Sequence, residues 1–438
     1  MPTFPPELTD DIIAWIPVVC GGSWHEDVRQ RYPTLLSCSL VCSAWLHASR
    51  HQLFEVLSVG TPERYDLLVS RVLHSEKMRI YLLSVRTVNL FIDPDTPAFN
   101  GKPFVHEFAG HLPNLTSMIF YLHGVEAFSS HPSSVVVMSR FSTVRTLKIQ
   151  NCTFPSFGDL RRTLCSLPSL SSLALWKLSW PDPAADLSPR LSHGTSAVRR
   201  PALLRLNVTS DNDPPSRRRA QQFIAWLSET ATTSSLLDLE VGIFNESTPG
   251  GQTGCMVTFG PSLFRLGRGV RKLEIAVGES RDTELELFLC TLTSLTSLHL
   301  RCYCVVKPDI WVQMERLVTS LPRPTQLIEL SISVIYDGPP ADFVGLESLD
   351  AALRPELLRA LQAVKLDIWY SRKERAWSEV EEPVLAVTEP TVRDVMKNRL
   401  PKLSARNIIE VTAHAFEPWV PPLHVDVEPE SGPMAALS

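Results

Sequence analysis

From about residue 80 onward, apolar residues recur in a short pattern: one apolar position is followed three and five residues later by two more. The pattern occurs at Val85, Val88 and Leu90; Leu115, Met118 and Phe120; Val144, Leu147 and Ile149; Leu170, Leu173 and Leu175; Leu203, Leu206 and Val208; Leu236, Leu239 and Val241; Val270, Leu273 and Ile275; Leu295, Leu298 and Leu300; Leu327, Leu330 and Ile332; and Leu361, Val364 and Leu366. Successive triplets begin 25 to 34 residues apart. A single triplet arises easily by chance in a chain that is 44% hydrophobic, so the regular spacing is what indicates a structural repeat.

Each triplet predicts a short buried strand, followed by a return path on the opposite side of the array. The last two apolar residues point inward from the strand, and the first packs at its entrance. Amphipathic segments predict return helices over residues 217–230, 284–292 and 310–321. A weaker eleventh strand is expected over residues 408–413.

The first sixty residues follow helical rather than strand periodicity. A short helix is predicted around residues 12–16 and is expected to end at Pro17. After a Gly-containing connection over residues 18–32, a second helical segment is predicted over residues 33–46 and a third over residues 48–56. Three helices of this size bury little apolar area by themselves, so exposed apolar residues among them would indicate a partner.

These patterns together predict an α/β protein with a modular organisation. An N-terminal three-helix domain (residues 1–60) is followed by a linking helix (residues 61–80). An irregular solenoid of about ten repeats is expected over residues 81–420, with short parallel strands on one side and helices or loops on the other. Residues 421–438 are expected to form a disordered tail.

Composition narrows the classes of function. The chain has 438 residues, a net charge of -5 and a pI near 6.2, which predicts no general attraction to nucleic acid or to anionic membranes. No apolar run approaches the length of a membrane-spanning helix, and residues 1–11 do not resemble a secretory signal. Nine cysteines are scattered over the chain and are expected to be reduced thiols. We therefore expect an intracellular protein, cytoplasmic and/or nuclear.

The N-terminal block resembles the F-box motif, in which Leu-Pro-x-Glu-Leu and branched apolar residues precede a Leu-rich helix that ends in Val-Cys-x-x-Trp. The matching residues are Phe4, Pro5, Glu7, Leu8, Ile12, Ile13, Ile16, Leu36, Leu40, Val41, Cys42, Trp45, Leu53 and Phe54. Phe4 stands where the family usually has Leu, and the connection between the two halves is longer than usual. With its repeat array, the chain looks like one of the fungal F-box proteins with degenerate leucine-rich repeats.

This resemblance implies a substrate-recognition subunit of a Skp-cullin-F-box ubiquitin ligase. The N-terminal helices would bind a Skp-type adaptor and, through it, the cullin and RING subunits. The repeats would hold a protein substrate, and catalysis would belong to other chains, so this chain itself is not expected to be an enzyme. The residues expected to contact the adaptor are Pro5, Leu8, Ile12, Leu36, Leu40, Val41 and Trp45.

An alternative gives the N-terminal helices a purely structural role. A solenoid needs a terminal unit that covers its core, and three helices would serve as such a cap. The chain would then be a leucine-rich-repeat scaffold or adaptor that acts without a ubiquitin ligase. Capture of a Skp-type adaptor distinguishes the two hypotheses.

The strand residues that alternate with the buried ones are expected to face the concave side of the solenoid. Aromatic and Arg side chains carry much of the binding energy in protein interfaces. The residues expected to bind substrate are therefore Phe91, Tyr121, Trp176, Arg205, Glu240, Lys272 and Arg301. The alternative is an ordinary solvated sheet face.

No residue pattern predicts a catalytic centre, a metal site or a cofactor. His106 and His111 resemble a zinc-protease motif, but they are five residues apart rather than four and so do not share one helical face. His299, Cys302 and Cys304 lie close in sequence, but on a strand His299 points away from the two cysteines.

Overall fold

A computed structural model gives the fold of the chain. It describes residues 6–19, 24–92, 102–122, 136–181, 201–211, 213–244, 259–277, 283–305, 310–322, 326–336, 345–353, 358–371 and 389–416. The expected C-terminal tail over residues 421–438 lies outside these ranges, as does Pro5.

Three helices form the N-terminal unit: α1 (Pro6–Val19), α2 (Trp24–Ser39) and α3 (Ser43–Glu55). Ile13 and Leu35 are fully buried and form its apolar centre. The three predicted segments exist, but their boundaries were wrong. The first helix continues past Pro17, and α2 begins within the predicted connection and contains Pro33.

The predicted second segment also breaks where continuous helix was expected. Ser37 and Ser39 donate their hydroxyls to backbone carbonyls in the preceding turn of α2, at 2.9 and 2.6 Å, and such bonds compete with regular helix. The chain turns at Leu40 and Val41, whose N–H groups bond three residues back at 3.1 Å. Leu40 and Val41 therefore lie at an exposed corner between two helices.

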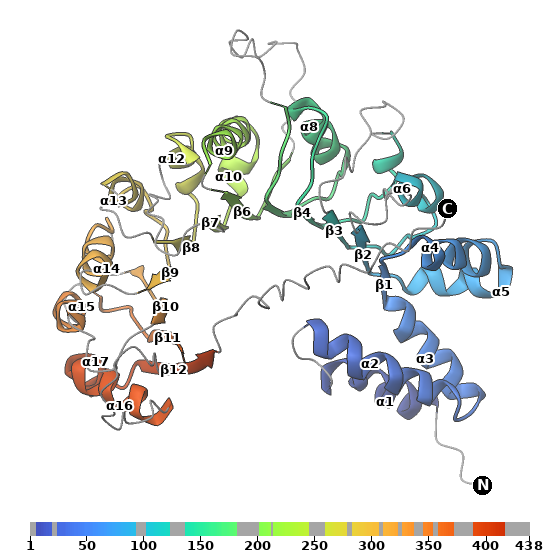
Figure 1. Ribbon diagram of the computed structural model, residues 1–438, viewed down its shortest axis with the longest axis horizontal. Helices are drawn as coiled ribbons and strands as arrows, with labels where there is room; N and C mark the ends of the chain where they lie inside the picture. The colour runs from blue at the N-terminus through green and yellow to red at the C-terminus, as the bar shows by residue number, and fades with distance from the viewer. Residues whose placement is uncertain are drawn as a thin grey trace, which may run out of the picture.

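The rest of the chain is one open sheet of twelve parallel strands that pair in sequence order. Its strands are β1 (Val56–Val59), β2 (Thr87–Ile92), β3 (Ser117–Leu122), β4 (Thr146–Gln150), β5 (Ser172–Trp176), β6 (Arg205–Asp211), β7 (Asp238–Phe244), β8 (Lys272–Ala276), β9 (Ser297–Val305), β10 (Glu329–Tyr336), β11 (Ala363–Ser371) and β12 (Ile409–Phe416). Figure 1 shows the strands along the inside of an arc and the helices along its outside. The predicted α/β solenoid is therefore present.

Every residue of the ten predicted triplets is buried. The second and third residues of each triplet stand in register along the sheet, as in the pairing of Val88 with Met118 and of Leu90 with Phe120. Backbone hydrogen bonds repeat with the same period: the carbonyl of Arg86 accepts from the N–H groups of Thr116 and Ser117 at 2.9 and 3.0 Å. A single apolar core therefore runs through the array.

The outer side carries one or two short helices for most repeats. They are α6 (Lys102–Phe108), α8 (Phe157–Ser166), α9 (Pro214–Leu227), α10 (Thr232–Ser235), α12 (Leu263–Gly267), α13 (Thr283–Leu289), α14 (Ile310–Thr319), α15 (Leu346–Ala352), α16 (Glu389–Arg399) and α17 (Pro401–Ala405). The three predicted return helices correspond to α9, α13 and α14. Their inward faces bury large side chains such as Phe223, Phe288 and Trp311.

The sheet begins earlier and has more strands than the sequence pattern predicted. The strand β1 starts at Val56, inside the expected N-terminal domain, and pairs in register with β2. The expected single linking helix over residues 61–80 consists instead of α4 (Pro62–Leu68), a π-helical turn η1 (Val69–Leu73), α5 (Glu76–Arg79) and a 3₁₀ turn η2 (Ile80–Ser84). At the other end, β12 confirms the weaker strand expected near residue 408.

The N-terminal unit is fastened to the first repeat through α3, which runs directly into β1. The ring of Phe54 stacks on Tyr81 with 5.6 Å between centroids, and His47 Nδ1 lies 3.1 Å from the Tyr81 hydroxyl. The carboxylate of Glu55 forms ion pairs with Arg31 of α2 at 3.1 Å and with Arg86 of the first repeat at 3.9 Å. The unit therefore covers the N-terminal end of the solenoid.

Candidate functional site

The first candidate surface is a set of exposed apolar side chains on the N-terminal unit, hereafter the N-terminal apolar surface. Its residues are Leu8, Ile12, Trp15, Leu36, Leu40 and Val41. Their exposed fractions run from 44% for Ile12 to 86% for Leu40. Three of them repeat along one face of α1, because positions 8, 12 and 15 follow helical spacing. The other three lie near the end of α2 and in the corner after it.

These six side chains are not among the buried residues of the unit and keep 44% or more of their surface exposed. Its own centre is formed by other residues, among them Ile13 and Leu35. Its contacts with the solenoid use residues on α3 and the buried side of α2, such as Phe54 and Arg31. Several large exposed apolar residues on one small unit are typical of a protein-binding surface.

Five of the seven residues expected to contact the adaptor belong to this surface, because Leu8, Ile12, Leu36, Leu40 and Val41 are all exposed. Of the other two, Trp45 is half-buried in the first turn of α3 and Pro5 lies outside the described residues. Sequence reasoning missed Trp15, although its spacing from Leu8 and Ile12 on a helix would have identified it.

The second candidate surface is the concave face of the sheet. Strand register places all seven residues expected to bind substrate on this face, in three adjacent rows that alternate with the buried positions. Phe91 on β2 and Tyr121 on β3 are paired, and their rings stack with centroids 4.8 Å apart. Burial raises the pKa of Tyr121. Trp176 stands in the same row but is separated from Tyr121 by Gln150 of β4.

An acidic and basic cluster occupies the middle of the concave face. Arg301 on β9 forms ion pairs with Glu274 on β8 and, at 3.6 Å, with Glu240 on β7. Glu240 also accepts a hydrogen bond from the amide of Asn207. His299, two residues before Arg301 on β9, has its Nδ1 atom 3.4 Å from the Glu274 carboxylate. Side-chain contacts in this cluster thus join four consecutive strands, β6 to β9.

The pKa values of the two carboxyls in this cluster are shifted in opposite directions. Burial, together with repulsion from Glu274, raises the pKa of Glu240 to about 7. Burial also acts on Glu274, but the hydrogen bond from His299 and the charge of Arg301 outweigh it and lower the pKa of that carboxyl. The charge of the concave face therefore changes near neutral pH.

A polar chain continues from this cluster toward the C-terminal repeats. His299 Nε2 lies 2.8 Å from the Ser333 hydroxyl, which donates to Asp367 at 3.4 Å. Asp367 also accepts from the indole N–H of Trp369 at 3.0 Å, and His414 Nε2 lies 3.0 Å from its other oxygen. Sequence reasoning missed Ser333, Trp369 and His414, although extending the strand alternation by one or two steps reaches each of them.

Arg205 and Lys272 lie in the row at the strand entrances, apart from the Arg301 cluster. Arg205 is 3.9 Å from Asp238 on the next strand, and the pairing register places Lys272 beside the same Asp238. Burial raises the pKa of Asp238, and the charges of Arg205 and Lys272 oppose this shift. The concave face thus has a mixed-charge middle next to an aromatic end.

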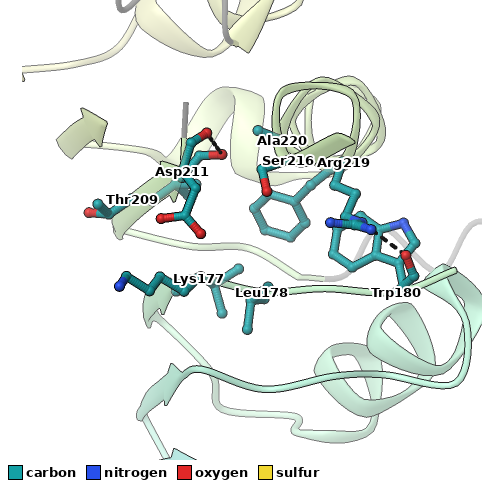
Figure 2. A pocket seen from close by; sticks show the side chains of 12 residues that line it. Lys177, Leu178, Trp180, Thr209, Asp211, Ser216, Arg219 and Ala220 are labelled. Atoms are coloured by element: carbon teal, nitrogen blue, oxygen red, sulfur yellow. Dashed lines mark hydrogen bonds between the residues drawn. The ribbon is translucent and has the colours of Figure 1, made fainter. Parts of the chain in front are cut away.

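A small cavity lies between the ends of β5 and β6 and the helix α9 (Figure 2). Its volume is about 30 Å³, which corresponds to the volume of a single water molecule. The polar groups at its wall are already engaged in the fold: Arg219 donates to the Trp180 carbonyl at 2.8 Å, and the Trp180 indole donates to Gln222 at 2.9 Å. The cavity therefore has no room for a substrate.

Within the described ranges, no group of three or more His, Cys, Asp or Glu side chains is placed to hold a metal ion. Among the described residues, the cysteines at 38, 42, 152, 165, 290 and 302 form no disulfide. None of the described helices is long and apolar enough to cross a membrane.

Comparison with known proteins assigns no family to this chain. The sequence matches no family model and no curated protein. A crystal structure of a TLR13-ssRNA13 complex is similar over 69% of this chain at 14% sequence identity, with a TM-score of 0.32. This chain spans 42% of that chain.

Proposed function

We propose that this protein is the substrate-recognition subunit of a Skp-cullin-F-box type ubiquitin ligase. The observation that carries the proposal is the N-terminal apolar surface, whose six large apolar side chains are 44–86% exposed. Five of its six residues are positions that match the F-box motif. Such a surface favours a permanent or frequent protein partner that covers it.

The solenoid supports the second half of the proposal. Its leucine-rich triplets form a rigid arc whose concave face carries stacked aromatic rings and a charged cluster centred on Arg301. Aromatic and Arg side chains on a preformed surface suit the recognition of a folded protein or a peptide. The receptor would act by holding the substrate near the transferring enzyme, which raises the effective concentration of substrate lysines there.

A second candidate is a leucine-rich-repeat scaffold that works without a ligase. The contacts of Phe54 and Glu55 with the first repeat favour it, because they attach the helices to the end of the array. Capping, however, uses only one side of the unit and gives no reason for six exposed apolar residues. The two roles are compatible, and adaptor binding decides between the candidates.

The experiment that tests the proposal is co-expression of the full chain with a tagged Skp-type adaptor, followed by capture through the adaptor's tag and size-exclusion chromatography. The proposal expects a stable complex that also recruits a cullin and RING subunit. A folded full-length chain that elutes separately from the adaptor would leave the scaffold hypothesis in its place.

A further inference from the structure

A groove runs between the N-terminal unit and the first repeat, and among the two surfaces described above it shares only Phe91 with the concave face. Its volume is about 870 Å³, within the range of ligand-binding pockets. The lining residues are Tyr32, Phe54, Leu57, Ser58, Val59, Gly60, Arg64, Leu67, Leu68, Arg71, Val72 and Phe91. Most of this lining is apolar, and Phe91 connects the groove to the aromatic end of the concave face.

One wall of the groove is a single face of the helical segment α4 and η1. Arg64, Leu67, Leu68 and Arg71 follow the spacing that places side chains on one helical face. Leu67, which lies between the two arginines on this face, is 57% exposed. The segment passes into the π-helical turn η1 before Arg71, a feature that is frequent at functional sites.

Arg64 and Arg71 give the groove a positive rim that the fold does not neutralise. In the part of the chain that the structure describes, neither guanidinium pairs with a carboxylate, whereas the nearby Arg31 and Arg86 both pair with Glu55. Arg71 follows Arg64 by seven positions, which corresponds to about 10 Å along the helix. A ligand with two carboxylates at a similar separation would neutralise both.

The groove is also lined by β1, which is the first strand of the sheet and pairs only with β2 among the described strands. The outer edge of such a strand presents backbone N–H and C=O groups that can pair with another extended chain. One of them, the carbonyl of Val56, accepts a hydrogen bond from the Tyr32 hydroxyl at 2.9 Å. Beyond this point Leu57, Ser58, Val59 and Gly60 line the groove, so this part of the strand is reached from it.

We propose that this groove binds an extended, acidic segment of a partner protein, which lies along β1 with aliphatic side chains against Leu67 and Leu68 and carboxylates at Arg64 and Arg71. In a strand, residues two and four positions apart share a face and lie about 7 and 14 Å from the first. A segment of the form Glu-x-Leu-x-Glu, with Asp or another aliphatic residue as equivalents, presents two carboxylates and an aliphatic side chain on one face, and the long Arg side chains span the difference between about 14 Å and about 10 Å. The inference rests on the proposed protein-binding function and assigns it a second, separate recognition site.

The test uses the purified full chain and a fluorescein-labelled seven-residue peptide, Ser-Glu-Ser-Leu-Ser-Glu-Ser, with fluorescence anisotropy at low salt. We expect saturable binding that weakens when Lys replaces both Glu residues of the peptide. The double variant Arg64→Glu with Arg71→Glu should lose about tenfold or more in affinity, since two charge-assisted contacts are reversed. Leu67→Asp should cause a comparable loss.

Two controls separate the groove from general electrostatics and from misfolding. The double variant Lys77→Glu with Arg140→Glu changes net charge equally at two exposed positions outside the groove and should bind the peptide as the wild type does. Circular dichroism and thermal melting check that each variant is folded, and Arg64→Gln with Arg71→Gln replaces the charge reversal if that variant is not.

Three results would overturn the inference. One is the absence of peptide binding by the folded wild type, and another is an equal loss in the Lys77 and Arg140 control. The third is binding that appears only after Asp426, Glu428 and Glu430 are replaced by amides in the full chain, because the groove would then belong to the chain's own acidic segment. No adaptor is present in this assay, so its failure leaves the adaptor-binding proposal untouched.

Discussion

Replacing Arg301 with methionine removes the charge at the centre of the concave face while keeping an apolar stem of similar length. Arg301 pairs with Glu240 and Glu274, whose side chains are 34% and 23% exposed. Without Arg301, the carboxylates of Glu240 and Glu274 on adjacent strands repel each other, because the positive charge that both of them pair with is gone. The variant should therefore be less stable, and the loss should depend on pH because Glu240 titrates near neutrality.

The size of the effect follows from the partial exposure of the cluster. Exposed ion pairs contribute about 0.2–1 kcal/mol, and removing one partner of a fully buried pair costs about 3–5 kcal/mol. Since these side chains are about one-quarter to one-third exposed, we expect a loss of about 1–2 kcal/mol at pH 8. Arg205→Met, whose side chain is 73% exposed and 3.9 Å from Asp238, should lose less than about 0.5 kcal/mol.

The sign of the pH dependence is fixed by the direction of the shift. The pKa of Glu240 is raised from 4.5 to about 7, so the folded state binds this proton more tightly than the unfolded state. Its contribution to stability is present below pH 4.5 and is lost as pH rises through 7. The lowered pKa of Glu274 changes the free energy of unfolding only below about pH 4.5. It therefore does not contribute to the difference between pH 5 and pH 8. Arg301→Met should therefore lose less stability at pH 5 than at pH 8.

Urea denaturation followed by circular dichroism at pH 5 and pH 8 measures both losses. Glu240→Gln should flatten the pH dependence, and the double variant with Arg301→Met should lose less than the sum of the single variants at pH 8. Equal losses for Arg301→Met at the two pH values, or no rescue by Glu240→Gln, would refute the electrostatic account and leave a packing effect.

Three further substitutions test the fold. Leu35→Ala empties a fully buried position of the N-terminal unit and should cost about 2–5 kcal/mol; urea denaturation that leaves this unit as stable as in the wild type would contradict its assigned centre. Gly267→Ala should cost about 1–3 kcal/mol, because an added Cβ would lie 2.7 Å from the Phe288 ring, and an unchanged melting temperature would count against that packing. The buried carboxylate of Asp350 accepts from the N–H groups of Lys402 and Leu403 at 3.2 and 3.1 Å, so Asp350→Ala should cost about 1–3 kcal/mol and speed amide hydrogen exchange at the start of α17; unchanged exchange there would be inconsistent with this cap.

The solenoid was predictable because one local rule repeats along the chain. A strand places alternate side chains on opposite faces, so a buried pair two residues apart, preceded by an entrance residue, identifies each repeat. The rule also extends to the strands that sequence reasoning missed or only weakly predicted: Phe54, Leu57 and Val59 form the same triplet at β1, and Ile408, Val411 and Ala413 form it at β12. The triplet at β1 was missed because Phe54 and its neighbours also fit the end of a helix.

The helix boundaries of the N-terminal unit were less predictable because local signals and tertiary packing disagree there. Proline usually ends a helix, yet α1 includes Pro17 and α2 includes Pro33. Packing of three helices around Ile13 and Leu35 outweighs these local preferences. The exposure of Leu40 and Val41 follows from the chain corner at that point, and no sequence periodicity shows the corner.

The sequence predicts which side chains lie on the concave face, but it does not predict which of them contact one another. Alternation places Glu240 and Arg301 on the same face, whereas their contact depends on the registers of three strands and on the geometry of the arc. The groove between Phe54 and Arg71 could not be found from the sequence, because it arises from the way the N-terminal unit is fastened to β1.

The most direct test of the central claim is the affinity of a Skp-type adaptor for the full chain, measured by isothermal titration calorimetry. The double variant Leu8→Ala with Leu40→Ala should weaken binding by about tenfold or more, since covering each side chain contributes about 1–2 kcal/mol, while Leu287→Ala, at a position 60% exposed on α13, should bind like the wild type. If the wild type binds and all variants bind equally, the adaptor does not use the N-terminal apolar surface. If the folded wild type does not bind, the protein is not a receptor of this ligase class.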